Sequence, residues 1–220
     1  MNLFGIHDLP LFILAGLLLN ITPGPDMLYI AGRTASQGFR SGLAAVMGIN
    51  AGCLVHTFAA AIGLSAILTA SAEAFFIIKL VGAAYLVYVG IALLLEKQTN
   101  PDALEISNVL PSKTVRQAFW QGFLTNVLNP KVALFFLAFL PQFISADSTA
   151  KPAAFVLLGL IFIFNSLFIT VGFAALVMQV HKQARRKFGN ASRAVLWLNR
   201  SCGALFIAIG VKLVISEKPT

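Results

Sequence analysis

Charged side chains are scarce in this sequence: 11% of its 220 residues are Asp, Glu, Lys or Arg, and 58% are hydrophobic. A soluble domain averages about 25% charged and about 45–50% apolar residues. So few charges cannot cover a surface that faces water, so the composition excludes a soluble globular protein. We predict an integral membrane protein in contact with the lipid bilayer, folded as one transmembrane domain over residues 1–220.

Basic residues are missing from the start of the chain, where the first Lys or Arg is Arg33. A cleavable secretory signal needs a basic segment ahead of its apolar run. The first apolar run is therefore expected to be a permanent membrane span. The net charge is +8, but Lys and Arg cluster in short segments between apolar runs. This pattern favours loops that set membrane orientation, and we expect no nucleic-acid partner.

Residues that could bind metal or perform catalysis are also few. Cys53 and Cys202 lie far apart in apolar runs, in no metal or redox spacing. They are interpreted as small buried apolar residues, and we predict neither a metal site nor a bound cofactor. Asp26 is the one acid deep in a predicted span, and His56 is the one histidine in the middle of a span. Paired carboxylates and Ser/His pairs are absent from the spans, which disfavours an enzyme.

Long apolar runs, by contrast, recur along the whole chain. A spanning helix needs about 20 apolar residues, and several runs are rich in Gly and Ala, which let membrane helices approach closely. The predicted fold is an all-α bundle with six transmembrane spans, at Leu9–Gly32, Ser41–Leu68, Phe75–Leu95, Ala118–Leu140, Ala153–Val180 and Val195–Ile215.

The basic residues predict the orientation of these spans. The first, third and fifth connections carry Arg33, Arg40, Lys97, Lys113, Arg116, Lys182, Arg185, Arg186, Lys187 and Arg193. The other connections carry Lys151 alone. Cytoplasmic loops are enriched in Lys and Arg, so the odd connections are predicted to be cytoplasmic and both termini periplasmic, although Lys212 and Lys218 then lie on the disfavoured side.

Two stretches in the first half of the chain are similar to two in the second half, and the alternatives are a true internal repeat and chance similarity among helices rich in Leu, Gly and Ala. The segment Gly16–Asn20 precedes Pro25 and Asp26, and Gly122–Asn126 precedes Pro130 and Lys131. The third and sixth spans also resemble each other. Three spans per half place the halves in opposite orientations, so we predict inverted repeats at about residues 1–96 and 118–220, joined by a cytoplasmic linker at about 97–117.

Proline breaks interrupt the first and fourth spans. Pro23, Gly24 and Pro25 lie in the first, and Pro130 lies in the fourth. A proline inside a helix removes a hydrogen bond at a cost of about 3 kcal/mol, and the freed groups must be satisfied by protein or water. Thr22 and Asn129 are expected to cap the new helix starts. Paired breaks in inverted halves are typical of the central site of a transporter.

Opposite charges follow the two breaks. Asp26 can accept from an ammonium group, and Lys131 can donate to a carboxylate, so together they suit a zwitterion such as an amino acid. Alternatively, the two charges neutralise each other, or Asp26 only stabilises its own helix start. The candidate substrate-binding residues are Asp26, Lys131, Asn129, Asn126, Asn20 and Thr22. The candidates for lining the path are His56, Asn50 and Asn165, which could instead be interior or interhelical polar residues.

Two signatures carry a family resemblance. The motif Pro23–Asp26 followed by Gly32-Arg33 and Gly38–Gly42, together with Asn126–Lys131 in the fourth span, resembles the LysE/RhtB amino-acid exporters. The resemblance covers essentially the whole chain. It implies a six-helix bacterial inner-membrane exporter of amino acids or close derivatives, with no bound cofactor. It also implies efflux driven by the proton-motive force, through antiport of protons.

We therefore expect a secondary exporter whose substrate binds between the first and fourth spans. A passive channel for small solutes and, with less support, a membrane-embedded enzyme are the alternatives. Two unique broken helices favour alternating access over a pore lined by charge rings or carbonyl filters. The sequence selects neither the amino acid nor a monomer over a homodimer.

Overall fold

The computed structural model describes residues 3–70, 114–145 and 147–183, with scattered helical positions between 73 and 95 and between 200 and 211. Within these ranges the chain is helical, and the only β pairing is an isolated bridge between Ile6 and Ile144. The all-α prediction is therefore confirmed. Most of the third and sixth predicted spans and most of the linker lie outside the described residues, so the six-span inverted repeat stays a prediction.

The first predicted span is two helices joined at a break. Helix α1 covers Leu9–Ile21 and α2 covers Pro25–Gln37, and they are bent by 51°. Pro23 ends α1 because it has no N–H to continue the helical bonds. Gly24 is the N-cap of α2, with Pro25 in the first helical turn. The predicted break is confirmed, but α2 continues five residues beyond the expected end at Gly32.

The fourth predicted span is broken in the same way. Helix α6 covers Val115–Val127, α7 covers Pro130–Ala138, and the 3₁₀ turn η5 covers Leu140–Phe143. The bend between α6 and the α7–η5 segment is 49°. The side chain of Asn129 accepts a hydrogen bond from the Lys131 amide at 3.0 Å, which confirms Asn129 as the cap of α7.

Two long helices complete the described spans. Helix α3 covers Phe39–Ala59 and continues through the π-helical turn η2, Ala60–Leu64, into α4, Ser65–Ala70. Helix α8 covers Lys151–Gln183. The segments long and apolar enough to cross a membrane are Phe39–Ile67 and Lys151–Val180, in agreement with the second and fifth predicted spans. With each bent pair counted as one, the described part of the chain holds four spans.

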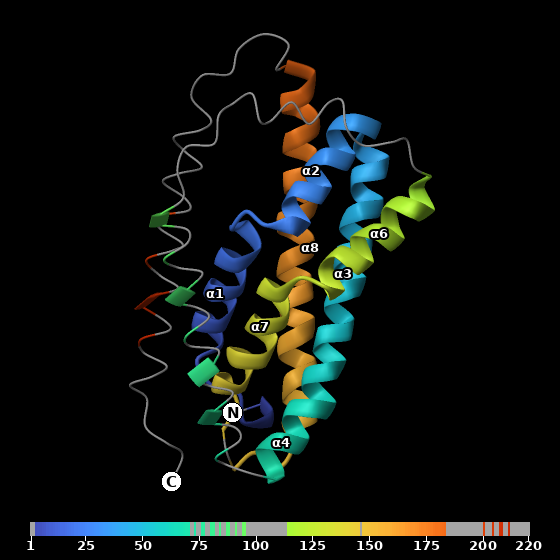
Figure 1. Ribbon diagram of the computed structural model, residues 1–220. Coiled ribbons are helices and arrows are strands. Elements are labelled where there is room, and N and C mark those ends of the chain that lie inside the picture. The colour runs from blue at the N-terminus through green and yellow to red at the C-terminus, as the bar shows by residue number, and fades with distance from the viewer. Residues whose placement is uncertain are drawn as a thin grey trace.

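The two broken pairs run antiparallel beside these long helices (Figure 1). At one end the amide of Ser145, after η5, donates to the carbonyl of Gly5, ahead of α1, at 2.9 Å. At the other end the Tyr29 hydroxyl on α2 donates to the carbonyl of Ala118 on α6 at 2.9 Å. Helix α1 therefore lies against α7, and α2 against α6, so the two breaks meet in the interior.

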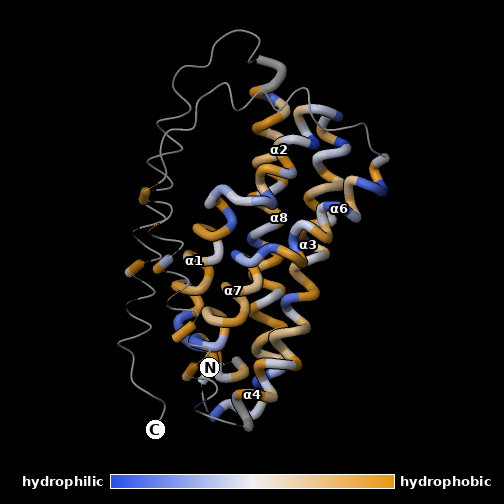
Figure 2. The backbone as a smooth tube through the Cα atoms, in the orientation of Figure 1, coloured by the Kyte–Doolittle hydropathy of each residue, from blue (hydrophilic) through white to orange (hydrophobic). Residues whose placement is uncertain are grey.

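Apolar residues predominate along the described helices (Figure 2), and many of them are buried in two clusters between the helices. A cluster of buried aromatic rings joins α1, α7, η5 and α8 through Phe12, Phe135, Phe139, Phe143 and Phe162. Glycines bring α3 and α6 close together. A Cβ on Gly122 would lie 2.6 Å from the carbonyl oxygen of Ala45. The small residues of the second span thus serve helix packing, as expected.

Arg33 differs from its expected position in a cytoplasmic connection. It lies inside α2 with an exposed fraction of 0%, and its guanidinium donates to Gln37 Oε1 at 2.9 Å and Gln121 Oε1 at 3.1 Å. The expectation is wrong because α2 restarts at Pro25 and carries Arg33 into the α2–α6 contact. Arg33 is therefore not a loop charge, and the predicted orientation depends on the other basic residues.

Candidate functional site

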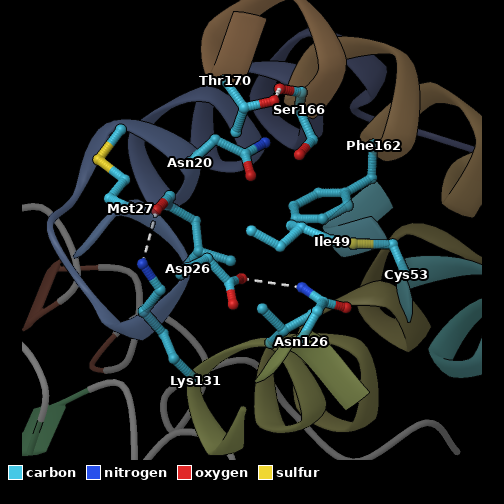
Figure 3. A pocket seen from close by; sticks show the side chains of 12 residues that line it. Asn20, Asp26, Met27, Ile49, Cys53, Asn126, Lys131, Phe162, Ser166 and Thr170 are labelled. Carbon is cyan, nitrogen blue, oxygen red and sulfur yellow. Dashed lines mark hydrogen bonds between the residues drawn. The ribbon is translucent and has the colours of Figure 1, made fainter. Parts of the chain in front are cut away.

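A cavity lies where the two breaks meet (Figure 3). Its walls come from α1, α2, α3, α6, α7 and α8, so every described span contributes. Its volume is about 20 Å³, which is room for about one water molecule. The described residues that line it are Leu19, Asn20, Asp26, Met27, Ile49, Cys53, Asn126, Lys131, Val132, Phe162, Ser166 and Thr170.

Asp26 enters this cavity from the first turn of α2. Its Oδ2 accepts a hydrogen bond from Asn126 Nδ2 at 2.8 Å, which joins the two broken pairs. Its Oδ1 is buried and has no hydrogen-bond partner within the described ranges. A carboxylate is favourable at a helix N-terminus, so Asp26 stabilises the start of α2 and keeps one oxygen able to accept a further hydrogen bond.

Lys131 reaches from the first turn of α7 to the end of α1. Its Nζ donates to the carbonyl oxygens of Leu19 at 3.0 Å and Thr22 at 2.9 Å. Pro23 cannot supply the N–H that would bond the Leu19 carbonyl in a continuous helix. These two hydrogen bonds hold the ammonium on backbone carbonyls. The lysine therefore caps α1 while it borders the cavity.

The second break is supported by His56. Its Nε2 lies 3.1 Å from the carbonyl oxygen of Asn126, the group that Pro130 leaves without its helical partner. Because a carbonyl only accepts, Nε2 must carry the hydrogen. His56 does not line the cavity, but it holds the backbone of Asn126, whose side chain bonds Asp26.

The other polar residues that the sequence singled out divide into two groups. Asn20 lines the cavity, and its Nδ2 is buried without a partner in the described part of the chain. Asn50 and Asn165 do not border the cavity. Asn50 Nδ2 donates to the Val46 carbonyl at 2.9 Å and to Thr170 Oγ1 at 3.4 Å, so it connects α3 with α8.

Thr22 does not cap α2, which corrects the expectation from the sequence. Its hydroxyl donates back to the Leu18 carbonyl at 2.6 Å, and the N-cap, Gly24, offers no side chain. The expectation is wrong because Thr22 continues the last turn of α1, where its own hydroxyl finds a nearer acceptor. The first backbone hydrogen bond of α2 runs from the Leu28 amide to the Gly24 carbonyl. The amides of Asp26 and Met27 therefore precede the first hydrogen bond of the helix.

Helix α8 contributes a wall that sequence reasoning missed. Phe162, Ser166 and Thr170 follow each other at four-residue steps and face the cavity together (Figure 3). The four-residue spacing of Phe162, Ser166 and Thr170 was the available signal, because residues four apart lie on one face of a helix. Cys53 is buried, as expected, yet it also lines the cavity.

These groups can hold opposite charges at once. Asp26 Oδ1 and Asn126 Oδ1 are buried acceptors without partners among the described residues. Asn20 Nδ2 is a buried donor that likewise has no partner there. Buried polar groups are normally hydrogen-bonded, so the three atoms suit a ligand with donors and acceptors. The cavity in this conformation has room for about one water molecule.

Comparison with known proteins places the chain in a family. The model of the LysE type translocator family matches residues 17–217. The homoserine/homoserine lactone efflux protein of Salmonella typhimurium is 25% identical over 202 residues, covering 92% of this chain and 93% of the relative. The threonine efflux protein of Salmonella typhi is 28% identical over 197 residues, covering 90% and 92%.

Another relative, an uncharacterized membrane protein of Pseudomonas aeruginosa, is 28% identical over 217 residues, with 97% of each chain covered. No solved structure matches the chain. The match of the family model and the apolar helices together confirm the resemblance seen in the two proline signatures. The chain belongs to the LysE type translocators and is a multi-pass membrane transporter, not an enzyme.

Proposed function

We propose that this transporter exports amino acids or close derivatives across the bacterial inner membrane, driven by the proton-motive force. The observation that carries the proposal is the shared cavity of the two antiparallel breaks, with buried acceptors and donors that lack partners in the described chain. The names of the relatives, which export homoserine, its lactone or threonine, support the same substrate class.

The substrate binds as a zwitterion between α2, α6 and α7. Its ammonium group, with three donors, bonds Asp26 Oδ1 and Asn126 Oδ1. Its carboxylate faces Asn20 Nδ2, the first amides of α2 and Lys131. The side chain of the substrate points to the α8 wall, where Phe162, Ser166 and Thr170 set its size and polarity.

Transport alternates access to this cavity. The end with Arg40 and Arg116 faces the cytoplasm and the termini face the periplasm, so the α2–α6 contact lies on the entry side. In the present conformation this contact is closed by the bonds Tyr29 to Ala118 and Arg33 to Gln121. Separation of α2 from α6 admits the substrate, and separation of α1 from α7 releases it.

Efflux from loaded cells tests the proposal. Cells that overproduce the protein are loaded with radiolabelled L-threonine or L-homoserine, and the initial rate of efflux is measured. Asp26→Ala and Lys131→Ala are expected to lower the rate at least tenfold, about what loss of one hydrogen bond to a charged group gives. Asp147→Ala and Lys151→Ala, an exposed acid and a lysine outside the cavity, are the matched controls.

Normal efflux in both cavity variants at normal protein levels would overturn the binding site. Counterflow in membrane vesicles separates a carrier from a channel. A carrier accelerates uptake of labelled substrate when unlabelled substrate is inside, whereas a channel shows neither exchange nor saturation. Collapse of the proton gradient is expected to abolish net efflux but leave exchange in place.

A further inference from the structure

Each proline break frees a backbone carbonyl, and a side chain from another helix takes it. Pro23 frees the carbonyl of Leu19, which accepts from Lys131 Nζ at 3.0 Å. Pro130 frees the carbonyl of Asn126, which lies 3.1 Å from His56 Nε2. Carbonyls within a membrane must be satisfied by protein or water. The two donors are therefore part of what holds each break in its observed geometry.

The two breaks differ in how they are held. The Asn126 carbonyl also accepts from the backbone amide of Asn129 at 2.9 Å. The Leu19 and Thr22 carbonyls both accept from one group, the ammonium of Lys131. The first break is thus the one whose contacts depend on a single flexible side chain.

Lys131 is also in a position to exchange these contacts for a ligand. Its side chain starts from the first turn of α7, where a positive charge interacts unfavourably with the helix dipole. The ammonium interacts favourably only with the C-terminal end of α1. Its side chain borders the cavity. A carboxylate there is a stronger acceptor for an ammonium group than two neutral carbonyls are.

We propose that Lys131 couples binding of the substrate's carboxylate to the bend between α1 and α2. In the empty cavity its ammonium holds the Leu19 and Thr22 carbonyls and stabilises the bend of 51°. When a carboxylate enters, the ammonium turns to it and releases the two carbonyls. The carbonyls then re-pair with water or backbone, and the last turn of α1 rearranges. This inference rests on the proposed function, and it assigns the trigger to the carboxylate, not to the amine.

Gly24 allows a mild test that leaves Lys131 in place. A Cβ on Gly24 would lie 3.2 Å from Lys131 Nζ, which is closer than an ordinary contact. Its φ of −177° is extended backbone that any residue adopts, so Gly24→Ala presses mainly on the ammonium. Gly172→Ala in α8 is the matched control, because a Cβ there meets nothing within 4 Å.

The experiment measures amide hydrogen exchange of the full chain in lipid nanodiscs, in peptides that cover residues 18–28. The probes are L-threonine and its amino alcohol, threoninol, which keeps the amine and lacks the carboxylate. L-Threonine is expected to speed exchange of the wild type about tenfold or more, as loss of a charge-assisted hydrogen bond would. Threoninol leaves it unchanged.

The variants separate the trigger from a purely structural role. Lys131→Met is expected to exchange fast without ligand and to lose the response to L-threonine. Gly24→Ala should show exchange between that of Lys131→Met and the wild type. Gly172→Ala should match the wild type. If Lys131→Met fails to fold, Gly24→Ala still decides. Equal responses to L-threonine and threoninol, no response to either, or wild-type exchange in both Lys131→Met and Gly24→Ala would overturn the coupling. Absence of amino-acid counterflow in the wild type would instead overturn the proposed function.

Discussion

The side-chain amide of Asn126 donates to the carboxylate of Asp26, 100 positions away in the chain, at 2.8 Å and so joins the two breaks. It is a direct side-chain contact between the two antiparallel broken pairs at the level of the cavity. The other oxygen of Asp26 and the side-chain oxygen of Asn126 are both buried and lack a partner in the described residues. The contact therefore positions two acceptors for one ligand.

Asn126→Ala should lower efflux without removing either charge. The variant leaves Asp26 without its hydrogen bond to Asn126, and a hydrogen bond to a charged group contributes about 1.5–3 kcal/mol. The rate of L-threonine efflux at low substrate is expected to fall roughly tenfold to a hundredfold. Ser36→Ala, which removes a hydroxyl bonded within α2 to Gly32, is the control. An unchanged rate for Asn126→Ala would contradict the binding geometry.

Gly122→Ala should destabilise the transporter through the α3–α6 contact. The added Cβ would lie 2.6 Å from the Ala45 carbonyl, and backbone cannot yield as a flexible side chain can. Overpacking of this kind costs about 1–3 kcal/mol. The midpoint temperature of thermal unfolding in detergent is expected to fall. It is measured by size-exclusion chromatography of the protein that stays soluble after heating. Gly63→Ala, where a Cβ meets nothing within 4 Å, should keep the wild-type midpoint.

Arg33→Met should loosen the contact between α2 and α6. The variant keeps an unbranched apolar stem but removes the bonds to Gln37 and Gln121 and the cation that lies 5.5 Å from the Tyr29 ring. We expect a loss of about 2 kcal/mol in the free energy of unfolding. Arg33→Lys should not restore it, because an ammonium cannot reproduce the planar fork. Denaturant unfolding checks this, with the exposed Arg40→Met as control.

Phe162→Leu should widen the range of substrates. Phe162 lies on the α8 wall with an exposed fraction of 1%, so a smaller side chain there enlarges the space for the substrate. The efflux rate of L-leucine relative to L-threonine is expected to rise about tenfold, since one methylene more or less in an apolar pocket changes selectivity by about that factor or more. Leu160→Ala, an exposed position on the same helix, is the control. An unchanged ratio would place the substrate side chain elsewhere.

The orientation of the chain can be tested with fusions. Green fluorescent protein fused to a terminus becomes fluorescent only when that terminus stays in the cytoplasm. Alkaline phosphatase fused to a terminus is active only in the periplasm. Phosphatase fused to either terminus should therefore be active, because the odd connections carry most of the basic residues. Fluorescent fusions at the termini would reverse the orientation, and with it the side from which the α2–α6 contact opens.

Much of the architecture was predictable because its causes are local. A proline removes its own N–H wherever it lies, so Pro23 and Pro130 determined both breaks, and Asn129 next to Pro130 determined a helix cap. Runs of apolar residues determined the spans around α3 and α8. Asp26, Asn126, Asn20 and Lys131 were found as cavity residues because polar side chains are costly inside apolar spans.

The partners of these groups were not predictable, because they come from distant parts of the chain. The sequence left Lys131 with a choice between a substrate, Asp26 and backbone, and only the fold placed its ammonium on the carbonyls of Leu19 and Thr22. In the same way, packing of α2 on α6 buried Arg33, and packing of α8 supplied Phe162. The sequence by itself determined where hydrogen bonds are missing. The tertiary structure decided which side chains supply them, since that depends on which helices are neighbours.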